Sequence, residues 1–261
     1  MLDFVTYCQG ALLDNESALR YLTHERRVSM DSIKEFSLGF CPTNTSFRRD
    51  HKELEKLKGR IIVPIFSEFG ELVGIAGRVP DKTVKGWWNT SFNKSSHLYG
   101  FNWARKHIFK NNKGYLIEGY LDRIILAQNC LINSVAVMSS SLGMRRVGLM
   151  ARYCDEICVC FDTDQNNAGL AGMLKTLSEL HQVGFGRKPS DQIDSESVCE
   201  NVSMIKMPVG VDPDVYVLDN GLEKFLSLET KLSVRQMMAA DAAHAELQEK
   251  MRKSQKRNKN D

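Results

Sequence analysis

The chain has 261 residues, of which 43% are hydrophobic and 26% are charged, a composition typical of a folded globular protein and not of a disordered or fibrous one. No stretch approaches the roughly 18 to 20 consecutive apolar residues of a membrane span, and no basic segment precedes an apolar run at the N-terminus, so we expect neither a membrane protein nor a secreted one. The seven cysteines are scattered, without CxxC pairs or Cys/His clusters at zinc spacing, so we expect reduced thiols in the cytoplasm and no zinc.

The net charge of +3 is unevenly distributed along the chain. Residues 1–110 carry 17 Lys and Arg against 12 Asp and Glu, residues 111–229 carry 10 against 16, and residues 230–261 carry 8 against 4. Carboxylates concentrate divalent metals, and Lys and Arg neutralise phosphates. An acidic middle between basic segments therefore suggests a cation site beside a surface for a polyanion. On these counts alone, ordinary solvated charge is an equal alternative.

The first hundred residues predict short helices followed by a β-hairpin. Residues 16–26 have apolar side chains at helical spacing, and residues 30–36 predict a second short helix. The apolar runs 60–66 and 72–79 bracket a polar turn that contains Gly70, which is the pattern of a hairpin.

From residue 114 onward, short apolar strands alternate with longer amphipathic segments, which predicts a parallel sheet with right-handed helical crossovers. Strands are expected at 115–117, 135–138, 157–161 and 204–207, and helices at 120–130, 144–153 and 168–182. Residues 183–202 lack periodicity and predict a surface loop. The chain is helix-forming from about residue 239, and its last ten residues, in a polar basic tail, are expected to be disordered.

Three sets of carboxylates follow predicted strands. Ligands of an open α/β sheet collect beyond the carboxyl ends of its parallel strands. Carboxylates that meet at one such edge repel each other unless cations neutralise them, and Mg²⁺ and Mn²⁺ prefer oxygen ligands. We therefore expect at least one Mg²⁺ or Mn²⁺ ion, and two or more in the complete site. One Asp-x-Asp pair alone is more often a solvated loop or a helix cap, so the prediction depends on all three sets: Glu118 with Asp122, Asp162 with Asp164, and Asp212 with Asp214.

This order of motifs resembles the Toprim domain shared by DnaG-type primases, type IA and II topoisomerases and some nucleases. Its signatures are a Glu after the first strand and an Asp-x-Asp after the third. The resemblance is closest to the primases, whose EGYMD, YDGDxAG and LPDGEDPD segments are similar to IEGYLD, FDTDQNNAG and MPVGVDPD here. Upstream, RIIVPI with GIAGR, FSLGFCP and SSHLYG are similar to further primase segments, so the resemblance spans roughly residues 1–225.

The resemblance implies a fold and a set of site residues. The fold is α/β: an α+β N-terminal subdomain at 1–112, a Toprim domain with a Rossmann-like parallel sheet and flanking helices at 113–225, and a helical C-terminal segment with a basic tail at 226–261. The implied catalytic residues are Glu118, Asp162 and Asp164, which also hold the metal together with Asp122, Asp212 and Asp214. The implied nucleic-acid contacts are Arg60, Arg78, Lys85, Asn89 and Lys94. Thr163 and Gln165 depart from the family's glycine and arginine at those places.

The function implied is that of a DNA-directed RNA primase, which makes short RNA primers on single-stranded DNA from nucleoside triphosphates. Possible partners are a replicative helicase and a separate zinc-domain or primosome protein, since neither a zinc-binding nor a helicase-interacting domain is recognisable. The expected location is the bacterial cytoplasm, or the host cytoplasm for a phage or mobile-element protein. The alternatives are a Toprim nuclease, in which the same metals activate water, and a non-catalytic DNA-binding protein derived from a primase.

Overall fold

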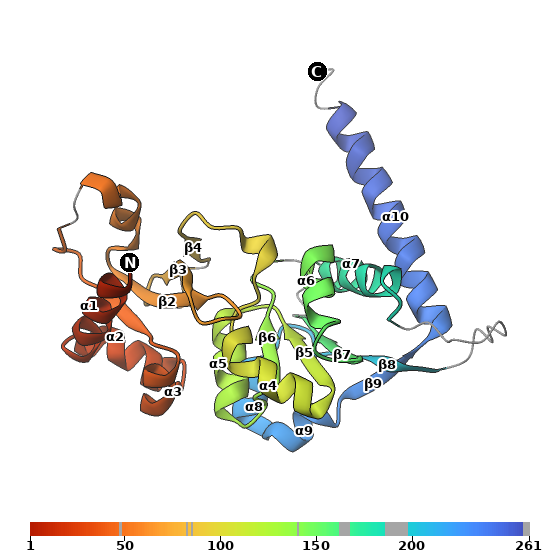
Figure 1. The fold of residues 1–261 in the computed structure, drawn as a ribbon, viewed down its shortest axis with the longest axis horizontal. Helices are drawn as coiled ribbons and strands as arrows, with labels where there is room; N and C mark the ends of the chain where they lie inside the picture. The colour runs from red at the N-terminus through yellow and green to blue at the C-terminus, as the bar shows by residue number, and fades with distance from the viewer. Residues whose placement is uncertain are drawn as a thin grey trace.

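The structure is a computed structural model that describes residues 1–46, 49–81, 83–84, 86–139, 141–161, 168–185 and 198–257. Three predicted site residues, Lys85, Asp162 and Asp164, lie outside these ranges, as do residues 258–261 of the predicted tail. The described chain forms two sheets with helices around them, and its C-terminal helix projects away from the body (Figure 1).

The first part of the chain folds as helices around a four-stranded antiparallel sheet of order β1-β2-β3-β4. Side-chain caps start both predicted helices, because Asn15 Oδ1 accepts from the Ala18 N–H (2.9 Å) and Ser29 Oγ accepts from the Ser32 N–H (3.1 Å). The helices predicted at 16–26 and 30–36 are thereby confirmed. The elements are α1 Leu2–Leu13, α2 Glu16–Arg20, the π-helix η1 Tyr21–Glu25, α3 Met30–Glu35, β1 Gly39–Cys41, η2 Arg49–Leu57, β2 Arg60–Phe66, β3 Leu72–Arg78, β4 Trp88–Asn89, η3 Lys94–Ser96 and α4 Phe101–Asn111.

The predicted hairpin is formed by β2 and β3, and its register decides which side chains share a face. Ile61 pairs with Arg78, and Val63 pairs with Ala76. Opposite residues of an antiparallel pair project to the same face, whereas neighbours along a strand project to opposite faces. Arg78 therefore lies on the face of Ile61, and Arg60 lies on the other face.

The second sheet has five strands in the order β6-β5-β7-β8-β9. The first four are parallel, as predicted, and β9 is antiparallel at the edge. The α/β fold class is confirmed. The elements are β5 Lys113–Ile117, α5 Tyr120–Gln128, β6 Ser134–Ala136, α6 Met144–Met150, β7 Glu156–Cys160, α7 Ala168–Gln182, β8 Val198–Ile205, α8 Pro213–Asn220, α9 Leu222–Leu226, β9 Glu229–Ser233 and α10 Val234–Arg257.

In the C-terminal third of the chain, the predicted bounds of the loop, the helix and the disordered tail were wrong. Residues 198–202 belong to β8 and not to a loop, since the chain there pairs with β7 and β9. Helix α10 begins at Val234, earlier than residue 239, and remains helical to Arg257, so part of the tail predicted to be disordered is helical. Strand β9 joins residues 229–233 to the second sheet. The domain boundaries at 112 and 225 stay predictions.

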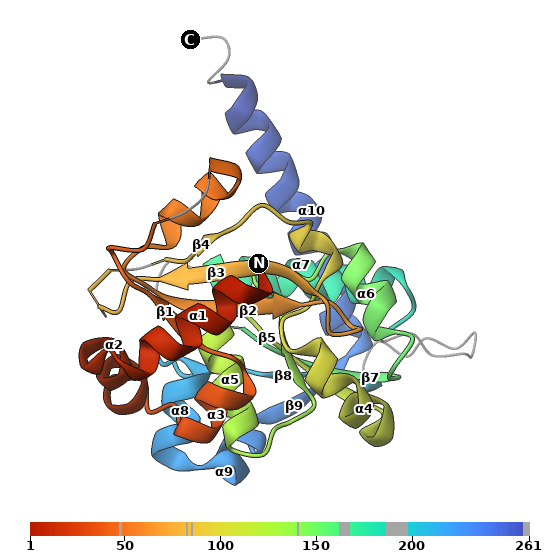
Figure 2. The ribbon, with the colours of Figure 1, turned by 60° about the vertical axis from the view of Figure 1, so that its left-hand side comes forward.

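A shared core holds the two sheets together. Leu22, Phe36 and Ile65 from the N-terminal part pack in one buried cluster with Ile124 and Ile125 of α5. In both ribbon views α5 lies between the first sheet and the second (Figure 2). The relative position of the two sheets is therefore fixed by packing along α5.

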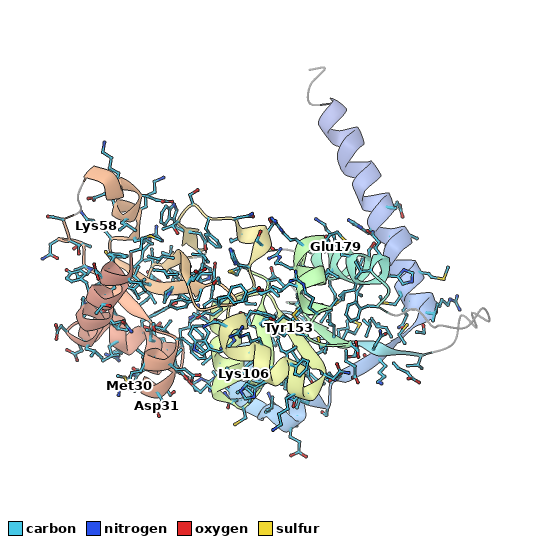
Figure 3. All side chains as sticks on the ribbon, in the orientation of Figure 1. Met30, Asp31, Lys58, Lys106, Tyr153 and Glu179 are labelled. Carbon is cyan, nitrogen blue, oxygen red and sulfur yellow. The ribbon has the colours of Figure 1, made fainter. Side chains whose placement is uncertain are left out.

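Helix α5 packs on one face of the second sheet, and α6, α7 and the start of α10 cover the opposite face. Buried residues of these helices, such as Val147, Leu180 and Met237, belong to one hydrophobic cluster with Val159 of the central strand β7. Glu179 of α7, labelled in Figure 3, accepts a hydrogen bond from the Gly143 N–H (2.6 Å) at the start of α6. No helix within the described residues is long and apolar enough to cross a membrane.

Candidate functional site

A cavity of about 630 Å³ opens between the hairpin sheet and the edge of the second sheet where β5 and β6 end. Seven of the predicted site residues line it. Four are acidic and three lie on the hairpin side: Glu118, Asp122, Asp212 and Asp214, opposite Arg78, Asn89 and Lys94. One cavity thus brings together carboxylates and basic side chains that are far apart in the sequence.

The acidic wall is built from the start of α5 and the start of α8. Glu118 follows β5, and Gly119 is the N-cap of α5, where a Cβ atom would collide with the carboxylate of Asp122. Asp212 is the N-cap of α8, and Asp214 follows Pro213 in the first turn. Carboxylates are stabilised near helix N-termini because the backbone N–H groups there point toward them.

Asp214 is the most buried of the four carboxylates. Its side chain is only 4% exposed, and Oδ1 accepts a hydrogen bond from the N–H of Val215 (2.7 Å). A buried carboxylate needs such donors or a cation nearby to remain charged.

The opposite wall consists of aromatic and basic side chains in contact with each other. The guanidinium carbon of Arg78 lies 5.7 Å from the centroid of the Trp87 ring, and the Trp87 ring lies 4.8 Å from that of Tyr120. Tyr120 Oη donates to Asn89 Oδ1 at 2.5 Å. Burial, followed by the charge of Arg146, lowers the pKa of Lys94 from its usual value. Trp87 is half-buried in this packing, which connects the hairpin to the start of α5.

Arg26 also lines the cavity, and we did not predict it. It is the C-cap of the π-helix η1, and its Nε donates to Tyr21 Oη at 3.0 Å. Burial lowers its pKa, but the hydrogen bond to Tyr21 and the negative charges of Asp214 and Asp122 outweigh burial and raise the pKa. The sequence shows the Glu25-Arg26-Arg27 run, but a π-turn has no reliable sequence signal. The sequence alone therefore does not predict that the Arg26 side chain is directed toward the cavity.

The structure does not place the other four predicted site residues in the cavity: Arg60, Lys85, Asp162 and Asp164. Arg60 does not line the cavity, and its Nε donates to the Lys56 carbonyl oxygen (2.9 Å) on the opposite face of the hairpin from Arg78. Lys85, Asp162 and Asp164 lie outside the described residues. Strand β7, which precedes Asp162 in the chain, lies between β5 and β8 in the sheet.

The donor atoms on the acidic wall are all carboxylate oxygens, which suit a hard divalent cation. Within the described part of the chain, no three His, Cys, Asp or Glu side chains are close enough together to hold a metal ion. The described carboxylates therefore form an acidic wall that offers oxygen ligands to a hard cation.

Residues 115–217 match the family described as Toprim-like. The DNA primase of Rickettsia conorii is 31% identical over 247 residues, which cover 84% of this chain and 39% of that protein. The catalytic core of the Escherichia coli primase superposes with a TM-score of 0.72 at 21% identity, covering 90% of this chain and 80% of that one.

The catalytic domain of a DnaG primase bound to single-stranded DNA superposes with a TM-score of 0.69 at 22% identity, covering 87% of this chain and 77% of that one. These structural likenesses show that the fold is shared. The chain spans well under half the length of the Rickettsia primase that it matches.

Proposed function

We propose that this chain, which carries a Toprim-like domain and has the catalytic-core fold of DnaG-type primases, synthesises short RNA primers on single-stranded DNA by metal-dependent nucleotidyl transfer. The observation that carries the proposal is the cavity in which an acidic wall from α5 and α8 faces a basic and aromatic wall from the hairpin. Such a site suits a reaction between polyanions, because one wall suits cations and the other neutralises phosphates.

We assign the acidic wall to cation binding. Glu118, with Asp162 and Asp164 after β7, would hold Mg²⁺ or Mn²⁺, two or more ions in the complete site, and the remaining carboxylates of the wall would complete the site directly or through water. When bound, such cations neutralise the leaving pyrophosphate and help to activate the attacking 3′-hydroxyl. The hydrogen bond to Tyr21 is the main cause of the raised pKa of Arg26, and the negative charges of Asp214 and Asp122 add to it, as expected beside a cation-attracting wall.

We assign the basic wall to phosphates of the template and of the nucleoside triphosphates. Arg78, Lys94 and Arg26 supply the charge, and Asn89 is held in place by Tyr120. These groups offer no pattern that reads bases, which suits template binding without sequence preference. Lys85 and Arg60 remain proposed nucleic-acid contacts, and Arg60 would act on the opposite face of the hairpin.

The partners and the location follow from this function. A replicative helicase and a zinc-domain or primosome protein are the partners that we propose beside the DNA template. The bacterial cytoplasm, or the host cytoplasm for a phage-encoded protein, is the corresponding compartment.

Incorporation of labelled ribonucleotides on single-stranded DNA with Mg²⁺ or Mn²⁺ tests the proposal, with DNA degradation followed in the same tubes. We expect short products from the unchanged chain. Glu118→Gln should reduce their rate by at least a hundredfold without changing the affinity for single-stranded DNA, because only the metal ligand is lost. Glu223→Gln, an exposed carboxylate on α9, is the matched control.

Full synthesis by Glu118→Gln would refute the metal assignment. Metal-dependent degradation without synthesis would establish a nuclease instead. DNA binding with neither reaction would indicate a non-catalytic DNA-binding protein.

A further inference from the structure

Tyr21 is a buried tyrosine that binds two cavity arginines at once. Its side chain is 1% exposed, and its Oη accepts from Arg26 Nε at 3.0 Å and from Arg78 Nε at 2.9 Å. The two arginines come from separate elements, since Arg26 caps the end of η1 and Arg78 is the last residue of β3. Both line the cavity, whereas Tyr21 does not. The phenol oxygen therefore lies behind the basic wall and joins its two guanidinium groups.

The π-helix explains how Arg26 reaches Tyr21. Residues five apart lie on different faces of an ordinary α-helix, which has 3.6 residues per turn. In η1 the Arg26 N–H instead bonds the Tyr21 carbonyl oxygen, five residues earlier, at 2.9 Å. The wider turn brings Arg26 above Tyr21, where its guanidinium carbon lies 5.6 Å from the centroid of the Tyr21 ring. Single π-turns of this kind are often found at functional sites.

The two guanidinium groups repel each other, and this repulsion has to be offset. Their Nε atoms can be no further apart than the sum of the two hydrogen-bond lengths to the shared oxygen. A phenol oxygen offsets part of the repulsion as a common acceptor, and the negative charges of Asp214 and Asp122 attract Arg26. The Nε atoms make these bonds, so the paired Nη groups, which bind phosphate oxygens in a bidentate manner, are not used in them.

We propose that Tyr21 is a positioning residue, which orients Arg26 and Arg78 toward the phosphates in the cavity. The proposal rests on the function proposed above. Its physical content is preorganisation: two long side chains that are fixed before binding lose less conformational entropy when a phosphate arrives. Tyr21 itself touches no substrate and exerts its effect through the two arginines.

Tyr21→Phe tests the proposal, because it removes only the shared acceptor and keeps the ring in the core. We expect the Kd for a single-stranded oligonucleotide, measured by fluorescence anisotropy, and the KM for ribonucleotides to rise about tenfold, with kcat within about twofold of the original. The matched control is Tyr99→Phe. Tyr99 is also fully buried, but its Oη has no hydrogen-bond partner within the described residues, so Kd and KM should not change.

A double-mutant cycle separates positioning from a purely structural role. If Tyr21 acts through Arg78, then adding Tyr21→Phe to Arg78→Ala should change Kd much less than adding it to the unchanged chain. Unfolding temperatures of all variants show whether any loss of binding comes from loss of fold.

Unchanged Kd and KM in Tyr21→Phe, or fully additive effects in the cycle, would overturn the proposal. If the unchanged chain binds DNA but makes no primers, the proposed function fails, while the anisotropy measurements still decide the role of Tyr21. If it binds neither DNA nor ribonucleotides, both proposals fail.

Discussion

Glu229, the first residue of β9, anchors this unpredicted strand to the second sheet. Its carboxylate accepts from Lys113 Nζ (2.5 Å) and Tyr115 Oη (3.1 Å) of β5 and from Ser203 Oγ (2.5 Å) of β8. The Glu229 and Lys113 side chains are 16% and 23% exposed. Burial raises the pKa of Glu229, but the hydrogen bonds from Lys113, Ser203 and Tyr115 outweigh burial and hold it below its ordinary value of 4.5.

Glu229→Gln should lower the free energy of unfolding by about 2 kcal/mol near pH 7, and the unfolding temperature by about 4 to 8 °C. Glutamine keeps the shape of the side chain, but its one carbonyl oxygen can replace only one of the two carboxylate oxygens, so it accepts from only one of the two hydroxyls. It loses the charge that pairs with Lys113, and that loss in a mostly buried setting costs more than a neutral hydrogen bond. The proposed primer synthesis, assayed at a temperature where both proteins are folded, should not change, because Glu229 does not line the cavity.

The loss should depend on pH in a defined direction. The pKa of Glu229 is lower in the folded than in the unfolded chain, so its contribution is complete above the ordinary value of 4.5 and disappears as the pH falls through the folded-state pKa. The difference between the two proteins should therefore be constant from about pH 6 to pH 8 and shrink below pH 4.5. Urea unfolding followed by tryptophan fluorescence measures it at each pH.

Asp219→Asn is the control, because Asp219 pairs with Arg27 at 2.7 Å but both side chains are about half exposed. Its effect should stay below about 0.5 kcal/mol. An equal effect of the two substitutions, or a Glu229→Gln effect that persists undiminished below pH 4, would refute the reasoning.

Two further substitutions test the contacts that hold the cavity walls together. Gly100→Ala should lower the free energy of unfolding, measured in urea, by about 3 kcal/mol or more, because Gly100 has φ +83° and a Cβ there would overlap the buried Arg123 side chain. Gly148→Ala is the control and should leave stability unchanged or raise it slightly, because a Cβ at residue 148 meets no other atom. Equal effects of the two substitutions would contradict this reasoning. Tyr120→Phe should cost about 1 kcal/mol and weaken binding of single-stranded DNA about threefold by anisotropy, because Asn89 loses its partner; unchanged affinity would show that Asn89 needs no such support.

The acidic wall could be predicted from the sequence because its causes are local. Apolar strands followed by Gly119 or by Pro208 mark the places where the chain leaves the sheet. In a parallel sheet all such ends share one edge, so Glu118 and Asp212 had to lie near each other once the strands were recognised. The same reasoning applies to the segment after β7, which lies outside the described residues.

The basic wall could be predicted only in part, because its geometry depends on register and on one irregular turn. Arg60 and Arg78 are both basic residues at hairpin ends, but the pairing of Ile61 with Arg78 places them on opposite faces. Arg26 reaches the cavity through a π-turn, which hydrophobic periodicity does not reveal. Strand β9 was missed since it pairs with β8 by contacts distant in the sequence, with only Leu232 buried among its five residues.

The position of the cavity depends on α5. The apolar composition of this helix indicates its position between two layers, although we did not use it in the prediction. Six of the nine residues of α5, including Arg123, are buried on several sides of the helix. A helix buried nearly all round must lie between two layers of structure, whereas a helix that covers one face of a sheet is polar on its outer side. The apolar run Ile124-Ile125-Leu126 beside Tyr120 and Leu121 therefore indicates a helix between two sheets. Because Glu118 and Asp122 stand at the start of that helix, its second packing partner had to lie close to the carboxylates, and the structure places the hairpin and its basic wall there.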